Sequence, residues 1–429
     1  MQAASLPRVL LLNVGFVPRV GGSFRALYEM ARRLPASSVE VLTSHNPAEE
    51  DFDKQQPLRI IRSGIFSLLD EEGTIPEVGY HGPVRKLFVI RILIRLKIFT
   101  LVAMFLLLLR TLWAVSRSRY DFVIAGQAWV VGWPALCAAK LCRKEYGVFV
   151  YGEDVSMIQH GRRDIISWLF MRALAGAKWI VCISSPTAMI TESLGVDRSK
   201  IHVIRPGVDA NLFKKDRSKL RSELKLEDTP VVLTVGRLID RKGFDLIIRA
   251  LPEVRQRVPG TVYLIRGDGP DKENLVKLTR ELNLEDCVIF LDEVPYQNLS
   301  EIYNACDVFA MPNRCDAATG EQEGFGMVFV EASACGKPVI GGRSGGAVDA
   351  VFDGRSGFLV SGTDTHELAD RLVELLLDGE RRSEMGESGR QFVEKHHSWD
   401  AHAAQVWQLV ERTNFPTDLP GLPVNLGSR

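Results

Sequence analysis

The sequence contains the apolar run Arg8-Val-Leu-Leu-Leu-Asn13, followed by the glycine- and proline-rich stretch Gly15–Gly22 and a helical pattern over Ser23–Leu34. The run has the length and composition of a buried strand, and the helical pattern places apolar residues on one face. A strand, a loop and a helix in this order form the opening unit of a doubly wound α/β fold. We therefore expect a Rossmann-like domain in this part of the chain.

A second unit of the same kind lies in the other half of the chain. Val231–Val235 is strand-like, Gly236–Gly243 is a loop bounded by glycines, and Phe244–Arg255 has a helical pattern. Other predicted strands are Val39–Thr43, Phe122–Ala125, Val148–Tyr151, Trp179–Ile183, Ile201–Ile204, Val262–Arg266, Val288–Phe290, Val308–Met311 and Val339–Gly341. Two successive sets of alternating strands and helices predict an α/β protein with two doubly wound, Rossmann-like domains facing each other across a cleft.

The length of 429 residues fits two domains of about 200 residues each. The break at Arg205-Pro-Gly-Val208 predicts an N-terminal domain over residues 1–208 and a C-terminal domain over residues 209–396. Residues 397–414 are expected to form a helix that packs back on the first domain. Residues 415–429, rich in Pro and Gly, are expected to be disordered. The stretch Pro57–Gly82 is the least regular and is predicted to be a loop.

Composition narrows the class of protein. Lys and Arg number 53, as do Asp and Glu, so the chain has no net charge with which to attract nucleic acid. The seven cysteines contain no C-x-x-C pair, which predicts reduced, buried thiols in a cytoplasmic protein. Residues 1–7 lack the basic and long apolar regions of a secretory signal, so none is expected.

One segment departs from this balance. Eight basic residues and no acidic one lie between Val84 and Arg119, around the apolar run Ile98–Leu109. Twelve helical residues span about 18 Å, less than the roughly 30 Å of a bilayer core, so a transmembrane span is not expected. Two interpretations stay open, a core helix and a helix on an anionic membrane surface, and a mixture of the two is favoured. The basic residues expected to meet the membrane are Arg85, Lys86, Arg91 and Arg95.

The most specific motif is Glu323-Gly-Phe-Gly-Met-Val-Phe-Val-Glu331. Gly324 and Gly326 allow a tight turn that approaches a ligand closely. The run that follows is helical in pattern, and the free amides of a first helical turn bind anions. A carboxylate beside such a phosphate site can accept hydrogen bonds from sugar hydroxyls, although two glutamates at this spacing can also lie on a solvated helix face.

Two further loops suit an anionic ligand. Gly236-Arg237-Leu-Ile-Asp-Arg241-Lys242-Gly243 follows a predicted strand, and its cations suit a diphosphate, although ordinary surface residues are the alternative. Pro18-Arg-Val-Gly-Gly22-Ser23, at the start of the first helix, is a weaker candidate for a backbone anion site. In facing Rossmann-like domains, these loops would meet at the carboxyl ends of both sheets.

With these motifs the sequence resembles the glycosyltransferase family 4 enzymes, which have the two-domain GT-B fold. The resemblance covers nearly the whole chain, including Val203-Ile-Arg-Pro-Gly-Val-Asp209, Gly267-Asp-Gly-Pro270 and Met311–Gly357. Pro18–Gly22, Arg241–Gly243 and Glu331-Ala-Ser-Ala-Cys-Gly-Lys-Pro-Val339 are similar to the branch that contains phosphatidylinositol mannosyltransferases. The resemblance implies a retaining hexosyltransferase that needs no metal, with an acceptor-binding N-terminal domain and a nucleotide-sugar-binding C-terminal domain.

The resemblance also implies a role for single residues. Arg237 and Lys242 would hold the donor diphosphate and stabilise the leaving nucleotide. Glu323 would bind hydroxyls of the transferred sugar, and Glu331 would bind the nucleotide ribose. The remaining donor-binding positions would be Gly22, Val294 near the base, Gly324, Phe325, Gly326 and Met327.

Tyr151 departs from the family pattern. Many relatives have His in a His-Gly-x-Glu/Asp arrangement where this chain has Tyr151-Gly-Glu-Asp154. Tyrosine can donate a hydrogen bond to a sugar hydroxyl, but it does not carry a proton near neutral pH as His does. Sugar preference and rate are therefore in question, and a residue that merely caps a strand is the alternative.

The expected function is transfer of a hexose, with GDP-mannose favoured as donor, to a lipid-linked or cell-envelope glycan at the inner face of the membrane. The alternative is transfer from UDP-glucose or UDP-N-acetylglucosamine to a soluble acceptor. A sugar-nucleotide epimerase of the same fold and a non-catalytic glycan-binding protein are the other classes considered. Arg237, Lys242, Glu323 and Glu331 together disfavour both.

Overall fold

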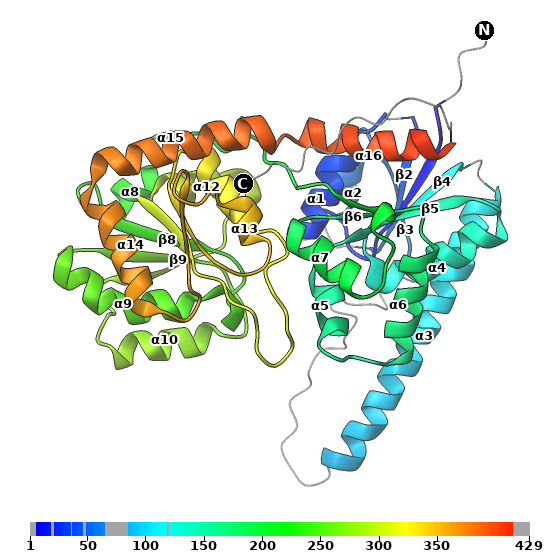
Figure 1. The fold of residues 1–429 in the computed structure, drawn as a ribbon, viewed down its shortest axis with the longest axis horizontal. Coiled ribbons are helices and arrows are strands. Elements are labelled where there is room, and N and C mark those ends of the chain that lie inside the picture. The colour runs from blue at the N-terminus through cyan, green and yellow to red at the C-terminus, as the bar shows by residue number, and fades with distance from the viewer. Residues whose placement is uncertain are drawn as a thin grey trace.

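The computed structural model describes residues 6–18, 21–35, 37–45, 49–64, 85–117 and 120–414. For residues 85–99 and 414 it describes the backbone only. Two parallel sheets, each covered by helices, lie side by side, and a long helical segment passes over both (Figure 1). The fold is therefore α/β with two Rossmann-like domains, as predicted.

The first sheet has seven strands in the order β3-β2-β1-β4-β5-β6-β7 among the described residues. These strands are β1 (Val9–Leu12), β2 (Val39–Thr43), β3 (Arg59–Arg62), β4 (Phe122–Ala125), β5 (Glu145–Val150), β6 (Trp179–Cys182) and β7 (Ile201–Val203). Its helices are α1 (Gly22–Ala31), α2 (Glu49–Lys54), α3 (Arg85–Arg117), α4 (Ala128–Leu141), α5 (Glu153–Gln159), α6 (Ile165–Gly176) and α7 (Ser185–Ser193), with a 3-10 turn η2 (Arg198–Lys200). β1 pairs with both β2 and β4, so the direction of strand addition reverses beside β1.

The second sheet repeats this order as β10-β9-β8-β11-β12-β13. These strands are β8 (Val231–Val235), β9 (Val262–Arg266), β10 (Val288–Leu291), β11 (Val308–Met311), β12 (Val339–Gly342) and β13 (Gly357–Val360). The helices are α8 (Lys219–Glu223), α9 (Phe244–Arg257), α10 (Lys272–Glu281), α11 (Leu299–Asn304), α12 (Met327–Ala334), α13 (Ala347–Ala350), α14 (Thr365–Leu377) and α15 (Gly379–His396), with 3-10 turns η3 (Asp240–Lys242) and η4 (Tyr296–Asn298). The reversal here lies between β8 and β11, which pair directly.

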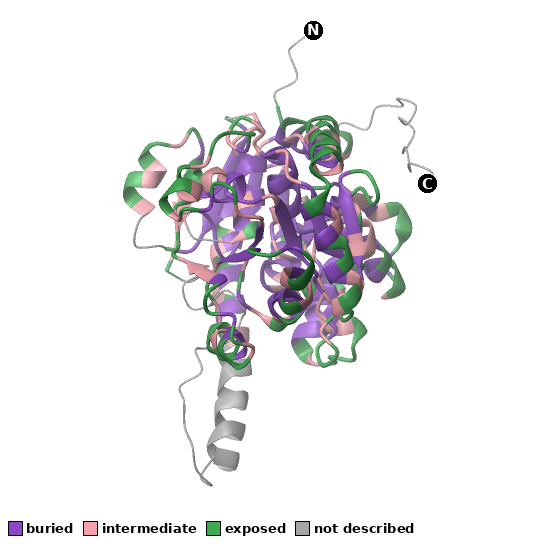
Figure 2. Cartoon of the chain, turned by 90° about the vertical axis from the view of Figure 1, so that its left-hand side faces the viewer, coloured by how far each residue is buried: buried purple, intermediate pink, exposed green. Residues whose placement is uncertain are grey.

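Apolar strands explain where the cores lie. Every residue of β1, β4 and β8 is buried, as is usual for parallel strands covered on both faces. Figure 2 shows the buried residues concentrated along the sheets and the exposed ones on the outer helices. The tertiary structure therefore rests on continuous apolar runs, which is why these strands could be predicted.

The sequence-based prediction was wrong at three places in the fold. β3 lies inside Pro57–Gly82, which was expected to be a loop. Its Arg-Ile-Ile-Arg sequence forms a half-exposed edge strand and lacks the continuous apolar run of a central strand. β13 was missed because its Gly-Phe-Leu-Val sequence is short and begins with a glycine. The seven cysteines are free, but Cys315 is exposed and Cys137 and Cys142 are only partly buried, so the expectation of buried thiols holds for four of the seven. Residues 65–84 and 415–429 lie outside the described part of the chain.

The basic helix is much longer than the apolar run from which a transmembrane span was not expected. α3 has 33 residues and is therefore about 50 Å long, so the argument from a twelve-residue run does not hold. By length and composition alone, Thr100–Arg117 could cross a membrane, with 39% of this window buried within the protein. Its residues Ala103, Leu107 and Val115 are buried in the first core, so one face belongs to the domain interior. The core-helix interpretation is thus confirmed for that face.

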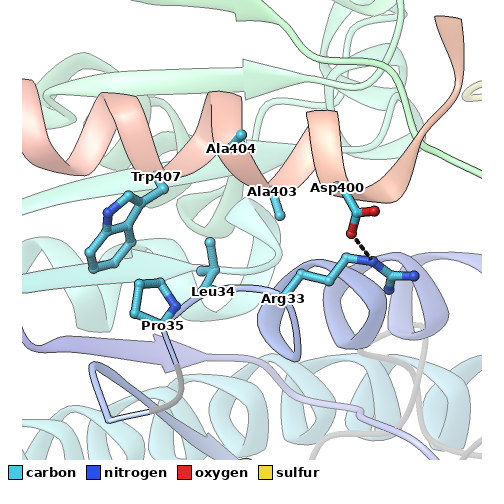
Figure 3. Close-up of a pocket in the computed structure, with 7 residues that line it drawn as sticks. All are labelled: Arg33, Leu34, Pro35, Asp400, Ala403, Ala404 and Trp407. Atoms are coloured by element: carbon cyan, nitrogen blue, oxygen red, sulfur yellow. Dashed lines mark hydrogen bonds and ion pairs between the residues drawn. The ribbon is translucent and has the colours of Figure 1, made fainter. Parts of the chain in front are cut away.

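The chain crosses between the domains twice, at residues 204–208 and at 396–399. Val208 pairs with Ser398 in an isolated bridge, and its amide donates to the carbonyl of His397 at 2.8 Å. Helix α16 (Trp399–Asn414) then packs on α1 of the first domain, where Arg33 pairs with Asp400 at 2.8 Å. A hollow of about 240 Å³ lies between these helices, lined by Leu34 and Trp407 among others (Figure 3).

Trp399 is the anchor of this crossing. Its side chain is fully buried, and a Cβ on Gly207 would come within 2.4 Å of its backbone nitrogen. Trp399→Ala should lower the free energy of unfolding by about 3–5 kcal/mol, because a large cavity would remain at the junction. Urea denaturation measures this loss. Gln408→Ala, at an exposed position of the same helix, should stay within about 0.5 kcal/mol of the parent protein, and equal losses would contradict the assignment.

Candidate active site

The candidate site lies where the loops after β8 and β11 meet. Parallel strands end at the same edge of a sheet, and ligands bind there beside the reversal of strand order. The loop after β8 contains Arg237, Arg241 and Lys242, and the loop after β11 contains Glu323. The ammonium Nζ of Lys242 lies 2.6 Å from the carboxylate oxygen Oε2 of Glu323, although the residues are 81 positions apart. Folding thus brings two of the predicted site residues into direct contact.

The carboxylate of Glu323 is held by two cations. Its Oε2 also accepts a hydrogen bond from Nη1 of Arg241 at 3.2 Å, and its side chain is only 11% exposed. Burial acts to raise the pKa of Glu323, but the charges of Lys242 and Arg241 outweigh it, and the pKa lies below its ordinary value. Glu323 is therefore ionised at neutral pH and available as a hydrogen-bond acceptor.

The glycines beside Glu323 shape a tight loop. Gly326 has a φ of 87°, a left-handed conformation that favours glycine, and it caps the amino end of α12. A Cβ on Gly324 would lie 2.2 Å from the carbonyl oxygen of Tyr151, so the backbones of the two domains touch here. Phe325 is buried, and Met327 opens α12, whose first amides lack partners within the helix. The predicted loop is thus built as an anion-facing helix start.

Glu331, on the same helix, has a different environment. Its Oε2 accepts a hydrogen bond from the hydroxyl of Tyr303 at 2.6 Å, and its Oε1 accepts a longer one from Tyr296 at 3.4 Å. Burial raises the pKa of Glu331, and the two hydroxyls offset this only in part. The weaker contact leaves Oε1 as the oxygen that a ribose hydroxyl could reach.

Three residues of the first domain lie close to this site. A Cβ on Gly22, at the start of α1, would lie 4.0 Å from the sulfur of Met327. The guanidinium of Arg25 stacks 3.8 Å from the ring centre of Tyr296. Glu153, at the start of α5, pairs with Arg241. Arg19 and Val20, part of the predicted anion loop, lie outside the described residues.

The remaining predicted residues surround this centre. Arg237 is exposed at the end of β8, and the carbonyl of Val294 accepts a hydrogen bond from Arg266 at 3.1 Å. Tyr151 follows β5 and packs beside Phe149, with ring centres 6.4 Å apart. Burial, and then the charge of Asp154, raise the pKa of the Tyr151 hydroxyl, so this group stays a donor at neutral pH.

Sequence reasoning missed several residues of the site. Arg241 was quoted within its loop but received no role, because only the fold shows that it reaches Glu323 and Glu153. Tyr296 and Tyr303 gave no motif signal, since their partner Glu331 lies about 30 positions away. Asp154 was quoted only as part of a pattern. Burial raises its pKa to about 7, against hydrogen bonds from the amides of Gly152 and Val155.

Models of two glycosyltransferase families match the chain. "Glycosyltransferase Family 4" matches residues 20–212, and "Glycosyl transferases group 1" matches residues 216–392. Solved structures show the same fold. The Anabaena protein HepE, solved with UDP, aligns with a TM-score of 0.73 at 19% identity, covering 94% of this chain and 99% of that one. Sucrose-phosphate synthase from Thermosynechococcus elongatus gives 0.74 at 21% identity, covering 96% and 100%.

Curated relatives include mannosyltransferases and D-inositol 3-phosphate glycosyltransferases. The GDP-mannose-dependent alpha-(1-6)-phosphatidylinositol monomannoside mannosyltransferase of Mycobacterium tuberculosis is 31% identical over 412 residues, which cover 94% of this chain and 97% of that protein. The enzyme of the same name in Mycolicibacterium smegmatis is 41% identical over 208 residues, so the chain matches about half (54%) of its length. The match to a Corynebacterium glutamicum mannosyltransferase is 38% over 210 residues and also covers 54% of that relative.

The fold, the anion-facing loops and these matches define a GT-B glycosyltransferase. The chain is an enzyme that transfers a hexose from a nucleotide sugar. It belongs to glycosyltransferase family 4, close to the phosphatidylinositol mannosyltransferases, as the sequence resemblance indicated.

The opposite pKa shifts of the two glutamates give a test of this geometry. The pKa of Glu323 is lowered, so its ion pairs stabilise the fold above the ordinary carboxyl pKa of about 4.3 and are lost as pH falls below it. The pKa of Glu331 is raised, so its contribution is complete below that ordinary value and declines as pH rises through the raised pKa. The two carboxylates should therefore respond to pH in opposite directions.

Glu323→Gln and Glu331→Gln are matched isosteric variants for this test. Below about pH 5, the melting temperature of Glu323→Gln should fall increasingly below that of the parent protein as pH rises, and above about pH 5 this difference should stay constant. Glu331→Gln should instead gain on the parent protein as pH rises above about 4.3, the ordinary carboxyl pKa. Differential scanning fluorimetry measures both differences, and parallel pH profiles for the two variants would refute the assigned environments.

Proposed function

We propose that the protein transfers mannose from GDP-mannose to a lipid-linked acceptor of the phosphatidylinositol mannoside type, with retention of anomeric configuration and without a metal ion. The observation that carries the proposal is the contact between Lys242 and Glu323. In a sugar nucleotide the hexose is bonded directly to the diphosphate. A site for both groups therefore needs a cation for phosphate next to a carboxylate for hydroxyls.

The donor is assigned to groups around this contact. Arg237 and Lys242 bind the diphosphate and stabilise charge on the departing nucleotide, which is an electrostatic role. The first amides of α12, at Gly326 and Met327, face the phosphates, with Gly22 approaching from the first domain. Glu323 binds the hexose and Glu331 the ribose.

The rest of the donor is bounded by three groups. Val294 borders the base, and the loop Gly324-Phe325 brings the second domain against Tyr151. The Tyr151 hydroxyl donates to a sugar hydroxyl at the position where many family members have His. The roles of Val294 and Tyr151 are supported by the family resemblance and by the positions of the loops that carry them.

The mannose donor and the lipid acceptor are supported by the names of the mycobacterial and corynebacterial relatives. α3 supports an acceptor presented at a membrane. Val102, Phe105, Leu109 and Trp113 are each about half exposed, and their spacing places them along one side of the helix. The guanidiniums of Arg110 and Arg117 stack on Trp113 at 4.6 and 5.1 Å. An apolar side edged by Arg is typical of a helix on an anionic bilayer.

The first prediction of this proposal concerns the donor and the product. With a phosphatidylinositol mannoside acceptor, GDP-mannose should be consumed at least about tenfold faster than UDP-glucose or UDP-N-acetylglucosamine. The new glycoside should be α by NMR, and excess chelator should leave the rate unchanged. Lys242→Ala should lose at least about tenfold in turnover, because the leaving nucleotide loses a counter-charge. Preference for a UDP-sugar, or a β-linked product, would overturn the respective part of the proposal.

The second prediction concerns the place of action. The protein should co-sediment with anionic vesicles at low salt and less at high salt, because such attraction is screened over about 8 Å at physiological ionic strength. Replacing Arg85, Lys86, Arg91 and Arg95 by Gln should release it, each cation contributing on the order of 1 kcal/mol. The side chains of these four residues lie outside the described part of the structure, but the helix backbone includes them.

A matched control removes the same charge from another surface. Arg249, Lys272, Lys277 and Arg280 are exposed on α9 and α10 of the second domain. Their replacement by Gln should leave vesicle binding unchanged. If the parent protein ignores anionic vesicles at low salt, a soluble acceptor at the cytoplasmic side becomes the better proposal.

A further inference from the structure

The guanidinium of Arg241 gathers carboxylates from both domains. Its Nη1 donates to Glu323 at 3.2 Å and its Nη2 donates to Glu153, while its Nε lies 3.9 Å from Glu321. The Arg241 side chain is only 11% exposed, so these contacts are largely removed from water. A planar, multidentate guanidinium suits this role, which a single ammonium cannot fill.

Donor binding changes the balance of charge at Glu323. One carboxylate oxygen, Oε2, now accepts from both Lys242 and Arg241. When an anionic diphosphate occupies the site, it competes with Glu323 for Lys242. Arg241 is then the cation that stays on Glu323, because its other contacts are carboxylates and not the phosphate-facing amides of α12. A buried carboxylate that lost both cations would be strongly destabilised.

Glu153 makes this contact dependent on the position of the first domain. It belongs to the first turn of α5, directly after Gly152, and its side chain is 53% exposed. At the neighbouring position, a Cβ on Gly152 would lie 3.3 Å from Cα of Gly324. The ion pair and the backbone contact therefore form together, where the two domains meet beside Glu323.

We propose that Arg241 is a positioning residue, which keeps Glu323 aimed at the transferred hexose after Lys242 has turned to the diphosphate. Glu153 holds Arg241 from the opposite domain, so the sugar-binding carboxylate is set only while the domains are in contact. The inference rests on the proposed role of Glu323 in binding the hexose. It adds that contact between the domains controls the placement of the sugar, whereas nucleotide binding does not depend on that contact.

The test separates sugar transfer from nucleotide binding. Arg241→Gln should lower kcat by at least about tenfold, while the dissociation constant of bare GDP, measured by calorimetry, changes less than about threefold. Glu153→Gln should lower kcat in the same sense by a smaller factor. Because both act through one contact, the double variant should be no slower than Arg241→Gln alone. Loss of GDP affinity in step with kcat would mean that Arg241 binds phosphate, and multiplied effects in the double variant would mean that Glu153 acts independently. Either result overturns the inference.

Two controls keep the outcome interpretable. Arg255→Gln removes a similar cation on α9, where Arg255 pairs with the exposed Asp286 at 2.8 Å, and it should leave kcat and GDP binding unchanged. Glu153→Gln lies at a half-exposed position and should keep the melting temperature of the parent protein, so its effect on kcat cannot come from unfolding. If Glu323→Gln transfers sugar normally, the proposed role of Glu323 itself fails. If Glu323→Gln is impaired and the Arg241 and Glu153 variants are normal, only the present inference fails.

Discussion

The contact between Lys242 and Glu323 is the interaction on which the assigned chemistry depends, and it follows from sheet topology. β8 and β11 are neighbours in the second sheet although three helices and two strands separate them in the chain. Both strands are parallel, so their carboxyl ends emerge side by side, and the loop that carries the cations meets the loop that carries the carboxylate. A cation and a carboxylate therefore become neighbours at the reversal of strand order, where doubly wound sheets bind ligands.

Electrostatics then gives the two carboxylates of α12 and its preceding loop different characters. Glu323 is buried beside two cations, and their attraction outweighs the cost of removing its charge from water. Glu331 is buried beside two tyrosine hydroxyls, which donate hydrogen bonds but carry no charge, and its pKa rises. One short segment, residues 323–331, thus carries a carboxylate that is readily ionised and another that is less acidic. The difference comes from neighbours contributed by other elements and not from the glutamates themselves.

The crossing between the two domains lies beside the candidate site, because the ring centres of His397 and Phe325 are 5.4 Å apart. His397 and His402 are buried at the crossing, and their Nδ1 atoms lie 3.1 and 2.9 Å from the carbonyl oxygens of Pro206 and Arg205. Burial lowers the pKa of each imidazole to about 4, so both are neutral under ordinary conditions and can donate through Nδ1. Neutral hydrogen bonds and an ion pair together fasten the crossing, because Arg205 also pairs with Asp349 of the second domain at 3.0 Å.

Local pattern was sufficient to predict most strands, the two Rossmann-like units, the loops that carry Lys242 and Glu323, and the helix that carries Glu331. Fully buried parallel strands are continuous apolar runs, and glycine-bounded loops after them are visible in a single sequence. The edge strand Arg59–Arg62 was not predicted, because a half-exposed strand has no such run. A helix long enough to span a membrane was not expected in α3, because charged turns flank its apolar run. Only the folded chain showed that Arg241 joins Glu153 to Glu323, or that Tyr296 and Tyr303 hold Glu331. These partners are distant in sequence, and their meeting depends on how sheets and domains pack, which no local pattern of residues encodes.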